Sequence, residues 1–350
     1  MLTSTSASTN MSRTRAIGAA AFGIGAAVGL ASIAASILRS QRFPLKGKTV
    51  FVIGGSRGLG LLLAEEFARR GAHVAISARN RDALERAAIR LRKTGAKIFT
   101  IQCDVTIRDE VADAIEKIER SLGPIDVLVN NAGTISVGPM ESMTVDDYRD
   151  SINTHFWGPY FTTMAVLPQM QKRRQGRIVN ISSIGGKLSV PHLLPYSVGK
   201  FALTGFSEGL RSALLKDNIY VTTVCPGLMR TGSPRNALIK GDTEAEYAWF
   251  SISDSLPILS MSAGWAARRI VNACVRGDAE LVLSLPAKLA VQFHGMFPGA
   301  TADVLALANK LLPAANGNTE AKTGRQSFSD VSPSWVTALT ERAAVTNNEL

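Results

Sequence analysis

The chain has 350 residues, 46% of them hydrophobic and 19% charged, which is the composition of a globular protein with an additional apolar part. Its net charge of +11 does not indicate nucleic acid as a partner. Six of the charges lie in the acid-free first fifty residues, and no basic stripe with interleaved aromatic side chains follows. The three cysteines, Cys103, Cys225 and Cys274, lack the spacing of a metal site or of a disulfide framework, so neither is expected.

The N-terminus combines a basic tail, residues 1–15, with an uncharged run of 23 residues, Ala16–Leu38. As a helix this run would be about 35 Å long, enough to cross a hydrocarbon core of about 30 Å. Two basic residues precede it and four follow, which predicts a membrane anchor with the catalytic body in the cytoplasm. A cleaved export signal and a mitochondrial transit peptide are alternative interpretations of the same segment.

A β-branched run, Lys48–Ile53, is expected to form a buried parallel strand. It leads through Gly54, Gly58 and Gly60 into the helical pattern Leu61–Arg70. Glycines between a strand and a helix let the backbone approach a pyrophosphate closely, and the helix N-terminus supplies free N–H groups. This order of elements predicts a dinucleotide-binding site.

The second expected strand, His73–Ala78, ends in Arg79 and not in the acidic residue that usually accepts the ribose 2′-hydroxyl of NAD. Arg79 and Arg57 of the glycine-rich loop instead offer cationic donors for a 2′-phosphate. The sequence therefore predicts NADP(H) as the cofactor. The alternative is that both arginines are solvated loop residues.

Strands and helices continue to alternate, with helices expected at residues 81–93 and 108–121 and strands at 97–102 and 125–129. This alternation predicts a doubly wound parallel α/β sheet of the Rossmann type in a single catalytic domain. Ligands of such sheets bind beyond the carboxyl ends of the strands, which is where Asp104, Asn131 and Gly133 stand.

Tyr196 and Lys200 are four residues apart, which places them on one face of a helix, and Ser183 precedes the tyrosine by thirteen residues. An ammonium close to a phenol favours the phenolate and lowers a pKa that is ordinarily about 10. Such a tyrosine can exchange a proton near neutral pH, and a serine hydroxyl can bond the same substrate oxygen. These three are the predicted catalytic residues, with Ser182 as an alternative to Ser183.

In their order and spacing these motifs resemble the short-chain dehydrogenase/reductase family, over roughly residues 46–235. Beside the glycines and the tyrosine–lysine pair with its serine, the matching motifs are Asp104-Val105, Asn130-Asn131-Ala132-Gly133, Asn153, Pro226-Gly227 and Thr231. The chain departs from the family at Ile53, where a threonine usually precedes the first glycine.

The resemblance implies a role for each residue of the site. Tyr196 would protonate a carbonyl oxygen as hydride arrives from the nicotinamide, and Ser183 would polarise the same carbonyl, so both are implied substrate contacts. Lys200 would lower the pKa of the tyrosine and bond the nicotinamide ribose. Asn153 would hold a water that links Lys200 to solvent; alternatively it only caps or bridges helix backbone.

The resemblance also implies a set of cofactor contacts along the crevice. They are Gly54, Ser56, Arg57, Gly58, Leu59 and Gly60 at the adenosine phosphates and ribose, Asp104 and Val105 at the adenine, Asn131, Ala132 and Gly133 at the adenine-side ribose, and Pro226, Gly227 and Thr231 at the nicotinamide amide, together with Arg79, Tyr196 and Lys200.

The segments after the motifs complete the expected organisation. Residues 46–260 form the expected catalytic domain, in which 228–260 is expected to be a movable lid. The aromatic residues of the lid indicate an apolar pocket or, alternatively, only pack the lid onto the body. Residues 261–312 form an extension on or beside the core, with a helix at 263–276 and a strand at 279–284 that could join the sheet edge. The polar residues 313–350 are expected to form a flexible tail. The family resemblance implies a homo-oligomer.

The histidines at positions 155, 192 and 294 have no paired carboxylate or second histidine at ligand spacing, so no catalytic role is assigned to them. The leading hypothesis is NADP(H)-dependent reduction of an apolar, lipid-like carbonyl compound, or the reverse oxidation. The alternative is a catalytically silent NADPH-binding sensor on the same fold, against which the complete catalytic set argues.

Overall fold

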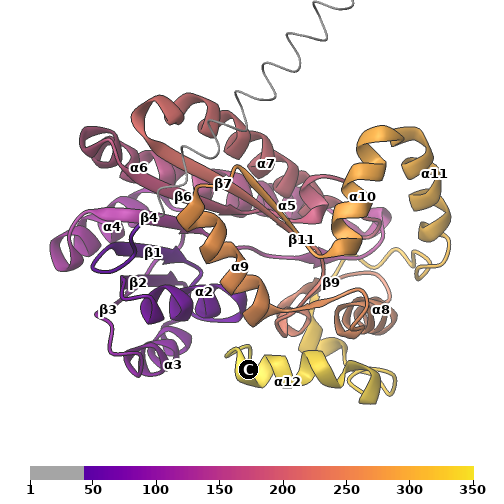
Figure 1. Cartoon of the computed structure of the whole chain (residues 1–350). Coiled ribbons are helices and arrows are strands. Elements are labelled where there is room, and N and C mark those ends of the chain that lie inside the picture. The colour runs from indigo at the N-terminus through magenta and orange to yellow at the C-terminus, as the bar shows by residue number, and fades with distance from the viewer. Residues whose placement is uncertain (1–42) are drawn as a thin grey trace, which may run out of the picture. The chain divides into compact units, whose positions relative to one another are not determined.

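The centre of the protein is a seven-stranded sheet, seen in a computed structural model that describes residues 43–350 (Figure 1). All strands are parallel, in the order β11–β7–β6–β4–β1–β2–β3. They are β1 (Thr49–Ile53), β2 (His73–Ala78), β3 (Ile98–Gln102), β4 (Ile125–Asn130), β6 (Gly176–Ile181), β7 (Ile219–Pro226) and β11 (Glu280–Leu283). The predicted doubly wound parallel sheet is confirmed. The strand order reverses between β1 and β4, where ligands bind in open α/β sheets.

Helices cover both faces of the sheet, as parallel strands require because their side chains are buried on both sides. In Figure 1, α2, α3 and α9 lie on one face, with α2 packed against α9, and α4, α5, α6 and α7 lie on the other. Their bounds are α2 (Gly58–Arg69), α3 (Arg81–Arg92), α4 (Arg108–Leu122), α5 (Val145–Ile152), α6 (Gly158–Arg173), α7 (Leu194–Leu214) and α9 (Ala263–Arg276). Between α5 and α6 stands a π-helical turn, Asn153–Trp157.

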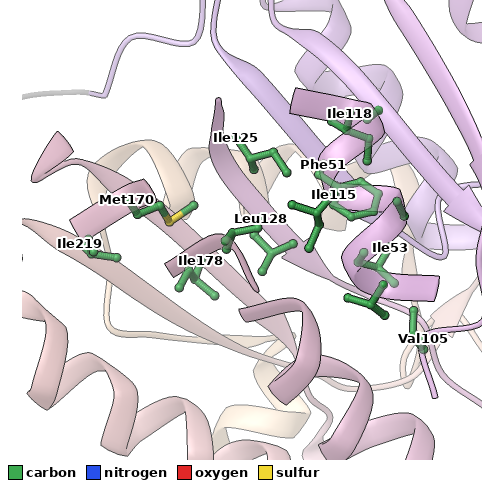
Figure 2. Close-up of a cluster of buried hydrophobic side chains, with 14 of the residues drawn as sticks. Phe51, Ile53, Val105, Ile115, Ile118, Ile125, Leu128, Met170, Ile178 and Ile219 are labelled. Carbon is green, nitrogen blue, oxygen red and sulfur yellow. The ribbon is translucent and has the colours of Figure 1, made fainter. Parts of the chain in front are cut away.

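The main core lies between the sheet and the helices α4 and α6 (Figure 2). Phe51, Leu128 and Ile178 come from three neighbouring strands and meet Ile115 of α4 and Met170 of α6. Each of these side chains is almost wholly buried, which contributes about 1.5–3 kcal/mol per residue to folding. This core fixes the carboxyl ends of the strands, from which the site is built.

The central sheet includes a strand that follows residue 260, where the expected catalytic domain ends. Helix α9 spans the predicted residues 263–276, and β11 pairs in parallel with β7 through Leu281–Val224 and Val282–Cys225. The strand expected at 279–284 therefore joins the sheet edge, and part of the extension 261–312 belongs to the core.

The segment expected to be a lid packs onto the body through a second, smaller core. The segment, residues 228–260, contains α8 (Thr243–Ser255) and the short strands β8 (Met229–Arg230) and β9 (Leu238–Ile239). β8 pairs in parallel with β10 (Met261–Ser262), and β9 lies between β5 (Ser136–Val137) and β12 (Lys322–Thr323) in a small sheet. Tyr247 and Phe250 of α8 are buried against Val137, Leu193 and Ile239.

Two short helices, α10 (Leu285–Met296) and α11 (Pro298–Asn309), follow β11 and lie at the edge of the body in Figure 1. Only Ala287 and Thr301 of the two helices are buried. The exposed apolar side chains of this part are Leu285, Leu289, Phe293, Met296, Phe297, Val304, Leu307 and Leu311. Within residues 43–350 the structure has no helix that is both long and apolar enough to cross a membrane. The predicted anchor, residues 16–38, and the tail 1–15 lie outside the described residues.

The C-terminal segment 313–350 is folded, against the expectation of a flexible tail. It contributes β12 and α12 (Ala338–Thr346) and lies against α8. The contacts are largely polar: Glu341 pairs with Arg235, and Ser332 shares a 2.7 Å hydrogen bond with Ser251. A polar composition hides this kind of docking, because specific hydrogen bonds hold the segment together with a few apolar contacts, such as Phe328 on Tyr247.

Candidate active site

A cavity of about 1010 Å³ lies beyond the carboxyl ends of the central strands. Its walls come from the loop after β1, the ends of β2, β3, β4 and β6, the start of α7 and the loop after β7. Every residue that the sequence assigned to catalysis or cofactor binding lines this cavity, except Gly60 and Asn153.

The glycine-rich loop has the shape of a phosphate cradle. Gly54 and Gly58 have φ angles of +69° and +56°, which favour glycine, and α2 begins at Gly58, which places a helix N-terminus at the loop. A Cβ on Gly60 would lie 2.1 Å from the carbonyl oxygen of Gly54, so Gly60 serves the close packing of loop and helix from behind. The side chain of Asn131 donates to the same carbonyl at 3.0 Å and holds the loop against β4. These residues fit a dinucleotide.

Two arginines line the cavity, one in the glycine-rich loop and one at the end of β2. Arg79 at the end of β2 has a side chain 74% exposed, and its nearest partner is Asp104 at 3.9 Å. Arg57 is 46% exposed and lies 3.5 Å from Glu349. Asp104 itself caps the next turn by accepting from the N–H and the hydroxyl of Thr106. Both guanidinium groups therefore have donors left for an anion.

The three predicted catalytic residues come together on the opposite wall of the cavity. Ser183 follows β6, and its Oγ accepts from the Gly185 N–H at 3.0 Å, which leaves the hydroxyl proton for Tyr196 or a substrate. A hydrogen bond joins Ser183 to Tyr196, which stands in the first turn of α7. Lys200, one turn later, is buried and donates to the Ile181 carbonyl at 2.8 Å. The alternative serine, Ser182, also lines the cavity, but its hydroxyl is bonded to Lys200 O and Thr204.

Burial decides the protonation of the tyrosine and the lysine in this structure. It raises the pKa of Tyr196 to about 12, although the hydrogen bond with Ser183 acts in the opposite direction. It lowers the pKa of Lys200 to about 7. The expected lowering of the tyrosine pKa by Lys200 is absent, because the ammonium is bonded to Ile181 and lies 5.6 Å from the centre of the phenol ring.

Asn153 is the one predicted catalytic residue that the structure keeps away from the cavity. It is exposed, and its carbonyl accepts the N–H of Gly158 in the π-helical turn. Two residues later, His155 is fully buried and lines the cavity. The signal that sequence reasoning missed is the i, i+4 spacing of Ser151 and His155, which share the buried face of the helix, whereas Asn153 points to the other side.

His192 has a partner that its sequence neighbourhood does not reveal. Its Nδ1 lies 2.7 Å from a carboxylate oxygen of Glu246 on α8, and Trp249 donates to the other oxygen at 2.6 Å. The expectation that His192 lacks a paired carboxylate is therefore wrong, because the partner stands 54 residues later in the chain. The pair fastens α8 to the loop that precedes Tyr196.

The last four residues of the chain lie on the glycine-rich loop. The carbonyl of Asn347 accepts the Gly58 N–H at 2.8 Å, and the side chain of Asn348 donates to Ser56 O at 2.8 Å. A carboxylate oxygen of Glu349 comes within 2.5 Å of the place where a Cβ on Gly58 would stand. Burial raises the pKa of Glu349 to about 7. The C-terminus thus uses donors that an anionic ligand of the cradle would use.

Comparison with known proteins finds the same motifs elsewhere. A family model described as short chain dehydrogenase matches residues 48–239. Gluconate 5-dehydrogenase from Gluconobacter oxydans (strain 621H) is 36% identical over 189 residues, 54% of this chain and 74% of that protein. 17-beta-hydroxysteroid dehydrogenase 13 from Mus musculus is 30% identical over 210 residues, 59% of this chain and 69% of that protein. The structure of L-sorbose reductase from Gluconobacter frateurii, complexed with NADPH and L-sorbose, superposes with a TM-score of 0.62 and 26% identity, covering 70% of this chain and 97% of that one.

Proposed function

The chain belongs to the short-chain dehydrogenase family, and from this premise we propose that it is an NADP(H)-dependent oxidoreductase that reduces a carbonyl to an alcohol, or catalyses the reverse reaction. Relatives named as dehydrogenases of gluconate and of hydroxysteroids support the general reaction, which exchanges carbonyl and alcohol with a nicotinamide cofactor. The observation that carries the proposal is the hydrogen-bonded pair Ser183–Tyr196 in the cavity wall, with Lys200 buried one helical turn away.

The cofactor, when bound, supplies or accepts the hydride at the carbonyl carbon. Tyr196 keeps its phenol proton at neutral pH, because burial raises its pKa, and donates it to the carbonyl oxygen. The hydroxyl of Ser183 orients the same oxygen. Lys200 titrates near neutral pH and so can hold or release a proton beside the tyrosine. In the oxidation direction Tyr196 would act as the base.

Replacing the tyrosine tests this assignment. We expect Tyr196→Phe to lower kcat by at least about 10³-fold, since the proton donor is lost, while the affinity for NADPH stays within about two-fold. Tyr148→Phe is the matched control, because Tyr148 stands on α5 and does not line the cavity. Turnover retained in Tyr196→Phe would refute the mechanism. A wild-type chain that binds NADPH without turning over any carbonyl would instead support the silent sensor.

The choice of NADP(H) is supported by the two arginines at the adenosine end. Charge-assisted hydrogen bonds to a 2′-phosphate are worth about 1.5–3 kcal/mol, so Arg79→Asp should lower the NADPH over NADH preference in kcat/KM by about 10–100-fold. Arg81→Asp is the matched control, because Arg81 is two residues away but does not line the cavity. An unchanged preference in Arg79→Asp would contradict the assignment.

An apolar substrate is supported by the lining of the cavity near Tyr196. Leucine, valine and aromatic side chains from the lid and the neighbouring loops face it: Val190, Leu193, Leu228, Trp249, Phe250 and Leu259. A panel of ketosteroids, retinals, 3-oxoacyl thioesters and small aldehydes, assayed by NADPH oxidation with protein lacking residues 1–42, tests this class. Higher kcat/KM for the small polar aldehydes would count against it.

Membrane association through residues 16–38 and a homo-oligomeric state complete the proposal. The mass of the mature N-terminus in a membrane fraction tests the first, and a soluble chain that begins near residue 40 would refute the anchor. Sedimentation velocity of the protein lacking residues 1–42 tests the second, with a monomer as the contradicting result.

A further inference from the structure

The buried imidazole of His155 stands directly behind the tyrosine of the site. Its ring meets the ring of Tyr196 edge to face, with 5.4 Å between centroids and 89° between planes. It comes from the π-helical turn Asn153–Trp157, in which an extra residue per turn re-aims the side chains; such turns are frequent at functional sites.

Two glycines make room for this ring. A Cβ on Gly133, just after β4, would lie 3.0 Å from Nε2 of His155, and a Cβ on Gly199 would lie 2.9 Å from Nδ1. Gly199 stands between Tyr196 and Lys200 on α7. The imidazole therefore fills the contact between the end of β4 and the helical turn that carries both reacting side chains.

Hydrogen bonds assign the protonation of the ring. The backbone N–H of Thr134 donates to Nε2 at 3.3 Å, so that nitrogen carries no proton. The hydroxyl of Ser151 donates to Pro195 O at 2.6 Å, so it can accept from Nδ1–H, which is 3.2 Å away. Burial and then the charge of Lys200 hold the pKa of His155 well below its usual value, which agrees with a neutral ring. The other ionisable group against the ring is Tyr196.

We infer that His155 is a positioning residue of the proposed reaction. Its ring accepts a hydrogen bond from Thr134, in the loop after β4, and contacts Ser151, which is bonded to Pro195. These contacts hold the ring of Tyr196 and the Gly199–Lys200 turn in place. The inference rests on the proposed function. It gives His155 the place in the site that the sequence assigned to Asn153. It also accounts for the hydrogen-bonded chain Thr134–His155–Ser151–Pro195, which links the loop after β4 to the first turn of α7.

Two substitutions at this position separate positioning from packing. His155→Phe keeps an aromatic ring and loses both nitrogens, whereas His155→Gln keeps an acceptor near the position of Nε2. Misplacing reacting groups by about 1 Å costs on the order of 100-fold, so we expect kcat to fall about 10–100-fold in His155→Phe with KM within about three-fold, and to recover largely in His155→Gln. Asn153→Ala, the competing substitution, is expected to leave kcat within about two-fold of the wild type.

Equal losses in His155→Phe and His155→Gln would show a packing role, and unchanged kcat in His155→Phe would overturn the inference. Thermal unfolding of each variant identifies a variant that fails to fold. In that case the wild-type chain still decides, because ¹⁵N chemical shifts of the imidazole should show the neutral Nδ1–H tautomer between about pH 5 and pH 9. A ring that protonates in this range, or the Nε2–H tautomer, would also overturn it. Failure of the proposed function is a different result, since then the wild type itself would reduce no carbonyl.

Discussion

The docked C-terminus predicts that the chain restrains its own cofactor site. Eight hydrogen bonds of 2.8–3.1 Å join residues 347–349 to partners between Ser56 and Arg325, and the Gly58 N–H of the phosphate cradle is among the donors. At about 1 kcal/mol each they stabilise the docked tail by about 8 kcal/mol. Ordering four residues costs about 6 kcal/mol. The docked state is then favoured by about 2 kcal/mol, which a dinucleotide must overcome.

A chain that ends at Thr346 should therefore bind NADPH about 30-fold more tightly than the full chain, since each 1.4 kcal/mol is a factor of ten. Isothermal titration calorimetry or the fluorescence of bound NADPH measures the two Kd values directly. An equal or weaker affinity of the shortened chain would refute the reasoning, because the tail would then cover the bound cofactor and not compete with it.

The same contact predicts a pH dependence. Burial raises the pKa of Glu349 to about 7, above the ordinary carboxyl value of about 4.3, so docking takes up a proton between these values. Docking is therefore most favoured below about pH 4.3, weakens as the pH rises towards about 7, and changes no further above that. The ratio of the Kd of the full chain to that of the shortened chain should be larger at pH 6 than at pH 8. In Glu349→Gln, which keeps the side-chain length without the titration, the ratio should not change with pH.

Three further predictions concern the lysines and the surface. Because burial lowers the pKa of Lys200 to about 7, kcat for reduction should fall as pH rises through about 7 and the ammonium is lost; a pH–rate profile that is flat from pH 6 to 9 would contradict this. Lys240→Met leaves Asp147, its buried partner at 2.6 Å, uncompensated, which should cost about 3–5 kcal/mol of unfolding free energy in urea titrations. Leu289→Ser with Phe293→Ser on exposed α10 should change that free energy by less than about 1 kcal/mol, and a larger loss would show that the helix is packed.

The fold was predictable because its signals are local. β-branched runs gave the strands β1, β2 and β4, and the glycines that follow β1 need no distant partner to take positive φ angles. The edge strand β11 was also predictable, since an apolar run after α9 has an open sheet edge to join.

The parts of the site that were missed depend on contacts between distant residues or on a change of helix type. Nothing local in the sequence distinguishes a π-helical turn from an α-helical one. Matching to the family motif therefore predicted Asn153, whereas the residue that the turn buries at the cavity is His155. The pair His192–Glu246 and the docking of residues 347–350 on the glycine-rich loop join segments 54 and nearly 300 residues apart. From the local sequence alone, the polar side chains of these segments would be expected to be exposed to solvent.

The spacing of Tyr196 and Lys200 predicted that both residues lie in one site, and both line the cavity, but it did not predict their protonation states. Two groups four residues apart on a helix influence each other only when their charged ends meet, and here Nζ of Lys200 is bonded to the Ile181 carbonyl. Desolvation then acts on each group separately and favours the neutral form of both. A neutral phenol is a proton donor, so the site is prepared to reduce a carbonyl below about pH 7, where Lys200 still holds a proton beside the tyrosine. We expect that oxidation of an alcohol, which needs the phenolate, requires Lys200 to leave the Ile181 carbonyl and bring its charge towards the phenol oxygen.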